Sequence, residues 1–160
     1  MVFSSLLHQR PLAAAELHGS AAYPDVTGTV LFFQTRDGVV VAAEVLGLPS
    51  PGGPCAWPVF GFHIHSGGRC SGNDMDTFAG AMTHDNPENC AHPAHAGDLP
   101  PLFGNNGRAA AAVLTDRFTV REVLGKTVIV HADRDDFTTQ PSGGVGTKIA
   151  CGEIVRFGVW

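Results

Sequence analysis

The sequence predicts an all-β fold, a sandwich or a barrel, with one long irregular loop. Several short segments rich in β-branched and aromatic residues lie between glycine and proline turn signals, and no segment has a convincing amphipathic helical period. Residues 66–107 contain no credible strand. Irregular segments longer than about 12–15 residues are uncommon in compact domains unless they are functional or disordered. Something within this loop must therefore hold its conformation.

The predicted strands are distributed over most of the chain. They span residues 26–34, 39–46, 59–65, 108–114, 127–131 and 149–157. The first two form a hairpin that the Pro/Gly/Ser-rich residues 49–54 end. Residues 118–124 are expected to form a short turn at most. Residues 1–20 carry no motif and are expected to be an N-terminal extension of a single domain that spans residues 1–160.

Composition and charge exclude two classes of protein. The chain has 160 residues, 44% hydrophobic and 16% charged, which is typical of a soluble globular domain. A net charge of −5 and the lack of a Lys/Arg cluster exclude a nucleic-acid-binding protein. No apolar stretch approaches the roughly 20 residues that span a membrane. The N-terminus has neither a basic start nor a sustained apolar run, so no signal peptide is expected and the predicted location is cytoplasmic.

Two histidines share one face of a predicted strand. Side chains alternate along a strand, so His63 and His65 project together while Phe62 and Ile64 face the core. Two adjacent imidazoles form half of a metal site. For the His-x-His pattern alone, two exposed surface histidines are an equally good interpretation.

The long loop carries three further histidines and a carboxylate within a short span. They are His84, His92, His95 and Asp98. Three imidazoles and one carboxylate form a plausible tetrahedral zinc shell, and a metal ion would organise the loop. The alternative is a polar loop that happens to be rich in histidine.

His131 ends the strongly β segment 127–131. Taken alone, it is better explained as a hydrogen-bonded core histidine than as a ligand. Asp135 and Asp136 follow closely and could orient its ring, since metal-bound histidines usually donate their second N–H to an acceptor.

Five motifs occur in order along the chain. They are Gly-Phe-His-Ile-His (61–65), His-Asp-Asn-Pro (84–87), His-Ala-Gly-Asp-Leu-Pro (95–100), Val-His (130–131) and Gly-Thr-Lys-Ile-Ala-Cys-Gly (146–152). In this order they resemble the copper–zinc superoxide dismutase family, bacterial type. The resemblance implies a Greek-key β-sandwich, or flattened eight-stranded barrel, with a long metal-binding loop. It also implies an enzyme that disproportionates superoxide to O₂ and H₂O₂ with copper and zinc as cofactors.

The resemblance further implies a role for each ligand. Copper would be bound by His63, His65, His84 and His131, and zinc by His84, His92, His95 and Asp98. His84 would bridge the two metals and act in catalysis by passing a proton to the nascent peroxide. Asp135 would link His63 to His92 behind the site.

One position departs from the family pattern. The family places an arginine three residues before the last cysteine, where it attracts and docks the anion, and this chain has Lys148 there. Lysine keeps the charge but loses the planar fork of donors. Steering of the anion should largely survive and local docking should suffer, so an active but slower dismutase with Lys148 as a catalytic residue is expected.

The four cysteines fall into two pairs. Cys70 and Cys151 match the internal disulfide of the family. For Cys55 and Cys90 a second disulfide is the preferred interpretation, ahead of two free thiols and of Cys90 as a zinc ligand. Disulfides are rare in reducing cytosol, so an extracytoplasmic location stays open.

Two other functions are compatible with the sequence. One is a non-enzymatic copper/zinc-binding protein on the same fold, and the other is a zinc-stabilised structural domain. The complete ligand set and the cation at position 148 favour the enzyme. No apolar face is diagnostic of assembly, and a homodimer is one possibility.

Overall fold

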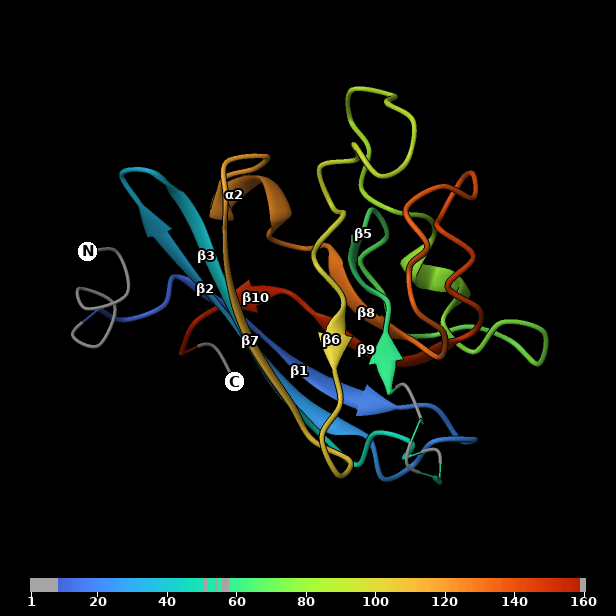
Figure 1. Ribbon diagram of the computed structural model, residues 1–160. Coiled ribbons are helices and arrows are strands. Elements are labelled where there is room, and N and C mark those ends of the chain that lie inside the picture. Colours follow the sequence, from blue (N-terminus) through green and yellow to red (C-terminus); the bar gives the residue numbers. More distant parts are fainter. Residues whose placement is uncertain (1–8, 51, 54, 56–57, 159–160) are drawn as a thin grey trace.

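The computed structural model describes residues 9–50, 52–53, 55 and 58–158 (Figure 1). The strands within these residues are β1 (Ala13–Gly19), β2 (Thr27–Thr35), β3 (Gly38–Leu46), β4 (Val59–Phe60), β5 (Phe62–His65), β6 (Leu102–Phe103), β7 (Ala109–Thr115), β8 (Thr127–His131), β9 (Lys148–Glu153) and β10 (Val155–Arg156). The helical elements are the 3₁₀ turn η1 (Ala79–Ala81) and the one-turn helix α2 (Val120–Val123), which lies in the expected turn at residues 118–124. None of the helical segments in the described part of the chain is long and apolar enough to cross a membrane.

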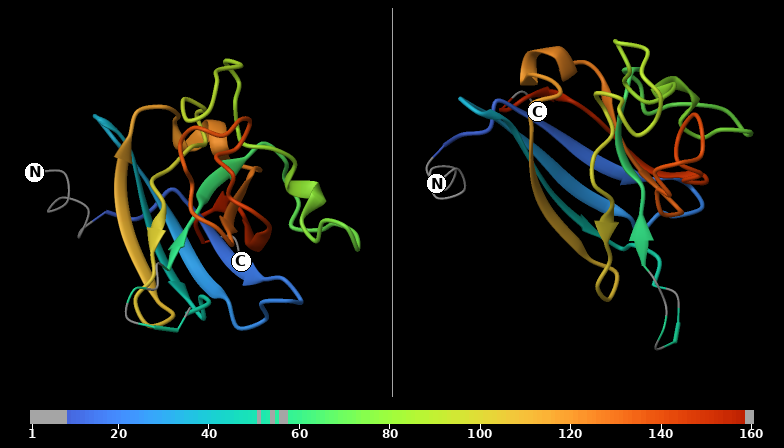
Figure 2. Two further views of the ribbon diagram at one scale, coloured as in Figure 1. Left: turned by 45° about the vertical axis from the view of Figure 1, so that its right-hand side comes forward. Right: turned by 45° about the horizontal axis from the view of Figure 1, so that its top comes forward.

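Most of the strands belong to one curled antiparallel sheet. Its order is β5-β8-β9-β1-β2-β3-β7, and β10 also pairs with β1. β4 and β6 form a separate two-stranded sheet, and β6 lies against β7. Figures 1 and 2 show the large sheet curving as a half-barrel. The predicted all-β class is confirmed.

A single large hydrophobic cluster joins the strands. Alternate residues of several strands enter it, such as Val30 and Phe32 of β2 and Val39 and Val41 of β3. This alternation of burial is what a pleated strand imposes, because successive side chains point to opposite faces. The Ala-rich segment 108–114 is confirmed as β7.

β1 lies in the middle of the sheet, although its residues were expected in an N-terminal extension. It pairs with β2 on one edge and with β9 and β10 on the other. Ala13, Ala15 and Leu17 are buried in the main cluster. The sequence does not predict this strand because alanine is depleted in strands and the segment has no β-branched residue.

Two predicted strands are interrupted. The segment 59–65 divides into β4 and β5 at Gly61, whose N–H donates to the Asp133 carbonyl at 2.8 Å. The segment 149–157 divides into β9 and β10. The long loop also contains β6, which the sequence did not indicate. The rest of that loop and the segment 132–147 gather beside β5 and β8 (Figures 1 and 2).

Candidate metal centre

β5 places His63 and His65 on the face opposite the core. Phe62 and Ile64 enter the main hydrophobic cluster, as the alternation predicts. The two histidines are nevertheless only 0% and 2% exposed, because loop segments cover their face of the strand. The interpretation as two exposed surface histidines is therefore wrong.

Backbone pairing joins the long loop to β5. Isolated antiparallel bridges pair His65 with His84 and His63 with Asp98. Directly opposed residues on neighbouring antiparallel segments have side chains within a few ångströms of each other. The backbone therefore brings one loop residue beside each of the two strand histidines.

Gly97 permits this close approach. The Ile64 N–H donates to the Gly97 carbonyl, and the Gly97 N–H donates to the Asp85 carbonyl, both at 2.9 Å. A Cβ at Gly97 would overlap the Ile64 carbonyl oxygen. A residue without a side chain is needed here for the loop to lie against the strand.

Four buried histidines form the first donor set. One ring nitrogen from each lies within 4.8 Å of the others; the residues are His63, His65, His84 and His131. His65 Nε2 lies 3.2 Å from His131 Nε2. His63 Nδ1 and His84 Nε2 have no hydrogen-bond partner. A set of imidazole nitrogens that face one point suits copper.

The second donor set surrounds one carboxylate. It consists of His84, His92, His95 and Asp98. Oxygens of Asp98 lie 2.8 Å from His84 Nδ1, 3.0 Å from His92 Nδ1 and 3.3 Å from His95 Nδ1. Three nitrogens and one oxygen match the tetrahedral shell of zinc. His84 offers Nδ1 to this set and Nε2 to the first, so its ring joins the two.

Several buried nitrogens in these sets make no hydrogen bond. They include His63 Nδ1, His84 Nε2, His92 Nδ1 and His95 Nδ1. The last two lie close to Asp98, at 3.0 and 3.3 Å, but are not hydrogen-bonded to it. An unsatisfied buried polar atom costs about 1–3 kcal/mol, and native proteins contain few. Cations at the two sets would satisfy all four atoms, so these residues fit copper and zinc.

Asp135 holds one ring of each set in place. Its carboxylate lies 2.8 Å from His63 Nε2 and 2.9 Å from His92 Nε2, and it accepts a 2.7 Å hydrogen bond from the Phe137 N–H. Burial acts to raise the pKa of Asp135, but these three hydrogen bonds outweigh it and hold the pKa well below its usual value. An ionised Asp135 accepts both Nε2–H groups, which leaves Nδ1 of each ring to bind metal.

Burial keeps two imidazoles of the copper set, those of His65 and His131, neutral, and stability should depend on pH as a result. Burial, reinforced by neighbouring His84, lowers the pKa of His65 to about 3, and burial together with His63 lowers that of His131 to about 2. The pKa of a histidine in the unfolded chain is about 6.5. Below this pH the unfolded chain binds protons at these two histidines and the folded chain does not, so stability falls as pH falls. Between pH 6.5 and 5 the metal-free protein should lose about 1.6 kcal/mol for each of these two histidines. Urea unfolding at several pH values measures this, and a flat profile would contradict it.

Arg117 stabilises the part of the long loop that carries His95 and Asp98, although it is not itself a member of the donor set. One of its guanidinium nitrogens, Nη1, donates to three backbone carbonyls, those of Pro93 (3.0 Å), His95 (3.1 Å) and Asp98 (3.4 Å). Two of these belong to donor residues. No motif marks Arg117 in the sequence, because its role depends on carbonyls that are distant in the chain.

Gln140 fastens the backbone of His92. The Gln140 side-chain oxygen accepts from the His92 N–H at 3.0 Å, and its amide donates to the His92 carbonyl at 2.7 Å. The segment 132–147 therefore binds His92 at two places: Gln140 binds its backbone and Asp135 binds its ring. The sequence analysis did not identify this residue either.

Comparison with known proteins identifies the family of the chain. Residues 26–154 match the family described as copper/zinc superoxide dismutase. The chain belongs to this family. The Cu-Zn superoxide dismutase of Photobacterium leiognathi is 36% identical over 141 residues, covering 79% of this chain and 78% of that one. The one from Legionella pneumophila is 32% identical over 162 residues, covering 96% and 93%. The Cu/Zn superoxide dismutase structure from Brucella abortus has a TM-score of 0.72 and 25% identity, covering 88% of this chain and 98% of that one.

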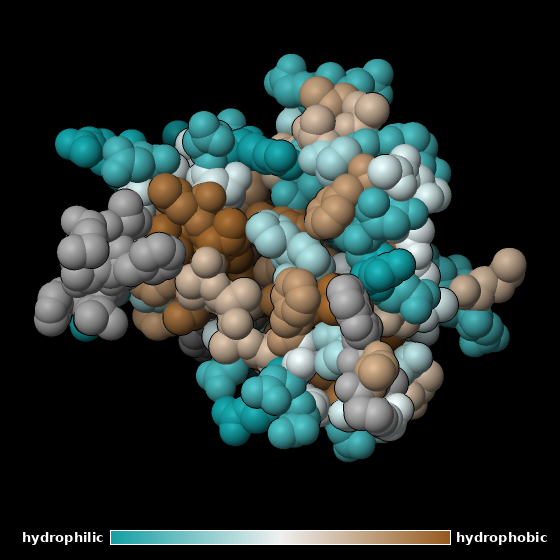
Figure 3. All heavy atoms as spheres, in the orientation of Figure 1, coloured by the Kyte–Doolittle hydropathy of each residue, from teal (hydrophilic) through white to brown (hydrophobic). Residues whose placement is uncertain are grey.

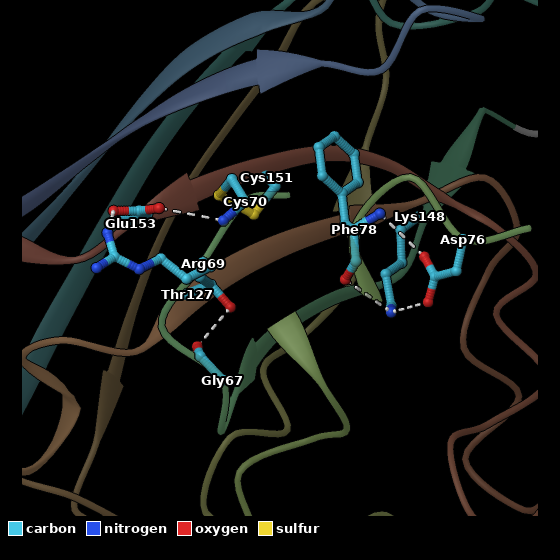
Figure 4. The surroundings of a disulfide bond; sticks show 9 residues. All are labelled: Gly67, Arg69, Cys70, Asp76, Phe78, Thr127, Lys148, Cys151 and Glu153. Atoms are coloured by element: carbon cyan, nitrogen blue, oxygen red, sulfur yellow. Dashed lines mark hydrogen bonds and ion pairs between the residues drawn. A yellow bond between two sulfur atoms is a disulfide. The ribbon is translucent and has the colours of Figure 1, made fainter. Parts of the chain in front are cut away.

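Lys148, the residue expected to depart from the family pattern, lies beside histidines of the first donor set. It lines a cavity of about 400 Å³ that three of those histidines also line, namely His65, His84 and His131. Its ammonium is engaged by the loop before η1, since Nζ lies 2.7 Å from Asp76 Oδ2 and 3.2 Å from the Phe78 carbonyl (Figure 4). The cation is at the expected location but carries an acidic partner that the sequence analysis did not anticipate.

The disulfide expected in a superoxide dismutase is present. Cys70 and Cys151 are bonded, and the bond fastens the long loop to β9 (Figure 4). The Cys70 N–H also donates to Glu153 at 3.1 Å. These contacts hold the loop to β9 at positions three and five residues after Lys148.

The preferred interpretation of the other two cysteines is wrong. Cys55 and Cys90 are exposed and unpaired. Cys55 lies in the loop after β3, and Cys90 lies in the long loop between His84 and His92. Cys90 as a zinc ligand is also wrong, because His84, His92, His95 and Asp98 complete the set without it.

Proposed function

We propose that the protein disproportionates superoxide at the two adjoining donor sets. The first would hold copper through His63, His65, His84 and His131, and the second would hold zinc through His84, His92, His95 and Asp98. The observation that carries this assignment is the position of His84. Its Nδ1 lies 2.8 Å from Asp98, while its Nε2 is buried without a partner among the other histidines. One ring therefore serves two sites.

Membership of the family makes the protein an oxidoreductase that acts on superoxide and uses copper and zinc. Bound copper supplies the one-electron redox chemistry by which two superoxide anions and two protons become O₂ and H₂O₂, and bound zinc supplies a fixed positive charge beside His84. His84 Nε2 is the atom of this chain that can hold a proton next to the substrate and release it to peroxide. Lys148 would hold the anion in the cavity.

A non-enzymatic metal-binding role is the weaker proposal. A carrier has to release its metal, whereas here outer residues hold the donors in place: Asp135 on His63 and His92, Gln140 on His92 and Arg117 on His95. Rigid support of this kind suits a resident metal.

The assignment is tested by metal analysis with an activity assay. One copper and one zinc per chain, with superoxide consumption above that of free copper in the presence of a chelator, are expected. His84→Ala should weaken both metals together by more than about 100-fold, because loss of an outer-shell partner alone typically costs 10–100-fold. His18→Ala is the control, since His18 is exposed on β1. A variant that loses one metal and retains the other fully would contradict the shared role of His84.

Lys148 variants test the docking role. Lys148→Ala should lower kcat/KM roughly tenfold, because the cavity loses its cation and the Asp76 carboxylate is left without its partner. Lys148→Arg should raise the rate, since a guanidinium has five N–H donors and keeps several after binding Asp76 and Phe78. Stopped-flow measurement of superoxide decay at several salt concentrations gives both values. Equal rates in all three proteins would exclude Lys148 from the reaction.

We also propose that the protein works in a reducing compartment, the cytoplasm. Exposed unpaired thiols such as Cys55 and Cys90 persist where thiols are kept reduced, and Cys151 is only 1% exposed, which shields the disulfide from reductants. Cell fractionation with detection of the native protein tests the location, and recovery from an extracytoplasmic fraction would overturn it.

A homodimer through the β6–β7 side is the proposed assembly. Phe103 of β6 and Leu114 of β7 are 69% and 39% exposed. Figure 3 shows hydrophobic side chains gathered over this half of the face, whereas the half with the metal loops is mainly hydrophilic. Sedimentation of the native protein and of Leu114→Asp tests it: a dimer that the variant disrupts is expected, and a native monomer would exclude it.

A further inference from the structure

We infer that Asp76 controls the attraction of anions to the site by pairing with Lys148. This inference rests on the proposed function, because Lys148 matters to the rate only if an anion is the substrate. Asp76 is therefore a residue that sets rate and anion specificity without belonging to either donor set.

The pairing is close and partly shielded from water. Lys148 Nζ lies 2.7 Å from Asp76 Oδ2, and the side chains of Lys148 and Asp76 are 15% and 43% exposed. Figure 4 shows the ammonium between the Asp76 carboxylate and the Phe78 carbonyl, which is 3.2 Å away. A charge-assisted hydrogen bond at this distance is stronger than a bond between neutral groups.

Local hydrogen bonds hold the Asp76 carboxylate in position for this contact. Its other oxygen accepts from the Phe78 N–H at 3.0 Å. The Asp76 N–H donates to the Asn73 side chain at 3.1 Å, and the Asp76 carbonyl accepts from Asn73 at 2.9 Å. The carboxylate is thus oriented by its own loop before Lys148 binds it.

The disulfide keeps the loop that carries Asp76 close to the strand that carries Lys148. The loop that carries Asp76 begins at Cys70, and Cys70 is bonded to Cys151, three residues after Lys148 on β9. Asp76 and Lys148 therefore each lie a few residues along the chain from a cysteine of the same disulfide. Movement of the loop away from Lys148 is restricted on that side.

The effect of the Lys148–Asp76 ion pair on an anion depends on how far the anion is from the pair. Far from the site, an ammonium and a carboxylate 2.7 Å apart act as a dipole, whose field falls off faster than that of a single charge. At contact, an ammonium has three N–H donors, and Asp76 and Phe78 occupy two. The third donor remains for an anion in the cavity. Asp76 therefore weakens long-range attraction while it holds Lys148 as a single fixed donor.

The pairing should also discriminate between anions by charge. The interaction of an unpaired ammonium with a dianion is twice that with a monoanion, so cancelling the ammonium charge removes more attraction from the dianion. Superoxide is a small monoanion that one hydrogen bond can hold. Inorganic phosphate, largely a dianion at neutral pH, would be disfavoured.

The first experiment measures the pairing without any enzyme assay. The chain has two lysines, Lys126 and Lys148, and Lys126 pairs with Asp85 at 2.6 Å. Limited acetylation of the copper- and zinc-loaded protein, followed by peptide mass spectrometry, gives the reactivity of Lys148 relative to Lys126. Asp76→Asn should raise this ratio severalfold, because a free amine reacts faster than one held in an ion pair. Asp74→Asn, an equal charge change at an exposed position in the same loop, should leave it unchanged. An unchanged ratio in Asp76→Asn would overturn the pairing even if the enzyme proved inactive.

The second experiment measures the effect on anions. Asp76→Asn should raise kcat/KM roughly threefold or more at low salt, steepen its salt dependence, and lower the phosphate concentration that halves the rate. Asp74→Asn should change these values much less. In a Lys148→Gln background the gain from Asp76→Asn should disappear, as a double-mutant cycle requires of coupled residues. Asp76→Ser, which keeps an oxygen for the Phe78 N–H, repeats the test if the asparagine variant folds poorly. Equal gains in the Asp76 and Asp74 variants, or a gain that survives without Lys148, would overturn the inference.

Discussion

Replacement of Cys70 and Cys151 by alanine is expected to lower the free energy of unfolding of the metal-free protein by about 4.5 kcal/mol, the loop-closure value for a crosslink of this span. The two cysteines are 81 residues apart in the sequence. The bond therefore removes a large share of the freedom of the unfolded chain, and its loss should be a considerable fraction of the stability of a domain of this size.

The chain supplies a matched control for this experiment. Cys55 and Cys90 are exposed and unpaired, and their replacement by alanine should change the free energy of unfolding by no more than about 0.5 kcal/mol. Urea unfolding of both double variants, in the absence of reductant, gives the two values. Similar losses in both would show that the Cys70–Cys151 crosslink does not stabilise the domain.

Replacement of Asp135 by asparagine is expected to weaken both metals by about 10–100-fold, the usual cost of losing an outer-shell partner. The carboxylate accepts from His63 Nε2 and from His92 Nε2, one in each donor set. Asparagine has one acceptor oxygen and an NH₂ group, so at least one ring would face a second donor. That ring would turn or change tautomer, and its Nδ1 would no longer be fixed for a metal.

Competition with a chelator measures this loss for copper and zinc separately. Asp136→Asn is the control, because the Asp136 carboxylate accepts hydrogen bonds from Thr138 and Thr139 and its asparagine form keeps an acceptor for them. Gly143→Ala provides a second route to the same defect. Gly143 has φ +75°, and a Cβ there would overlap the Asp135 carboxylate and crowd His92 Nε2. If Asp135→Asn and Asp136→Asn held the metals equally, Asp135 would have no positioning role.

The donor residues could be predicted from the sequence because their arrangement follows local rules. His63 and His65 lie on one face of a strand by alternation, and the spacing of His92, His95 and Asp98 keeps them in one bend of the chain. The motif order then adds His131. The burial of all these residues was not predictable, since it depends on loops that fold back over β5.

The contacts that support the site were not predictable for the same physical reason. Arg117, Gln140 and Asp76 bind atoms that are distant in the sequence, and most of their partners are backbone carbonyls, which every residue has. For Cys55 and Cys90 the sequence led to the prediction of a contact that does not exist. Two unassigned cysteines suggested a bond, but pairing requires Cα atoms within about 7 Å, and sequence does not give that distance.

The central position of β1 has a consequence for how the chain is made. β1 has its first partner, β2, within a few residues, but its other partners, β9 and β10, lie much further along the chain and are synthesised much later. Until those segments emerge, one edge of β1 offers unpaired backbone N–H and C=O groups, which is the feature that recruits strands of other chains. Contacts of such long sequence separation also form slowly. The growing chain on the ribosome is therefore the form most exposed to self-association, and the arrival of β9 and β10 ends that exposure.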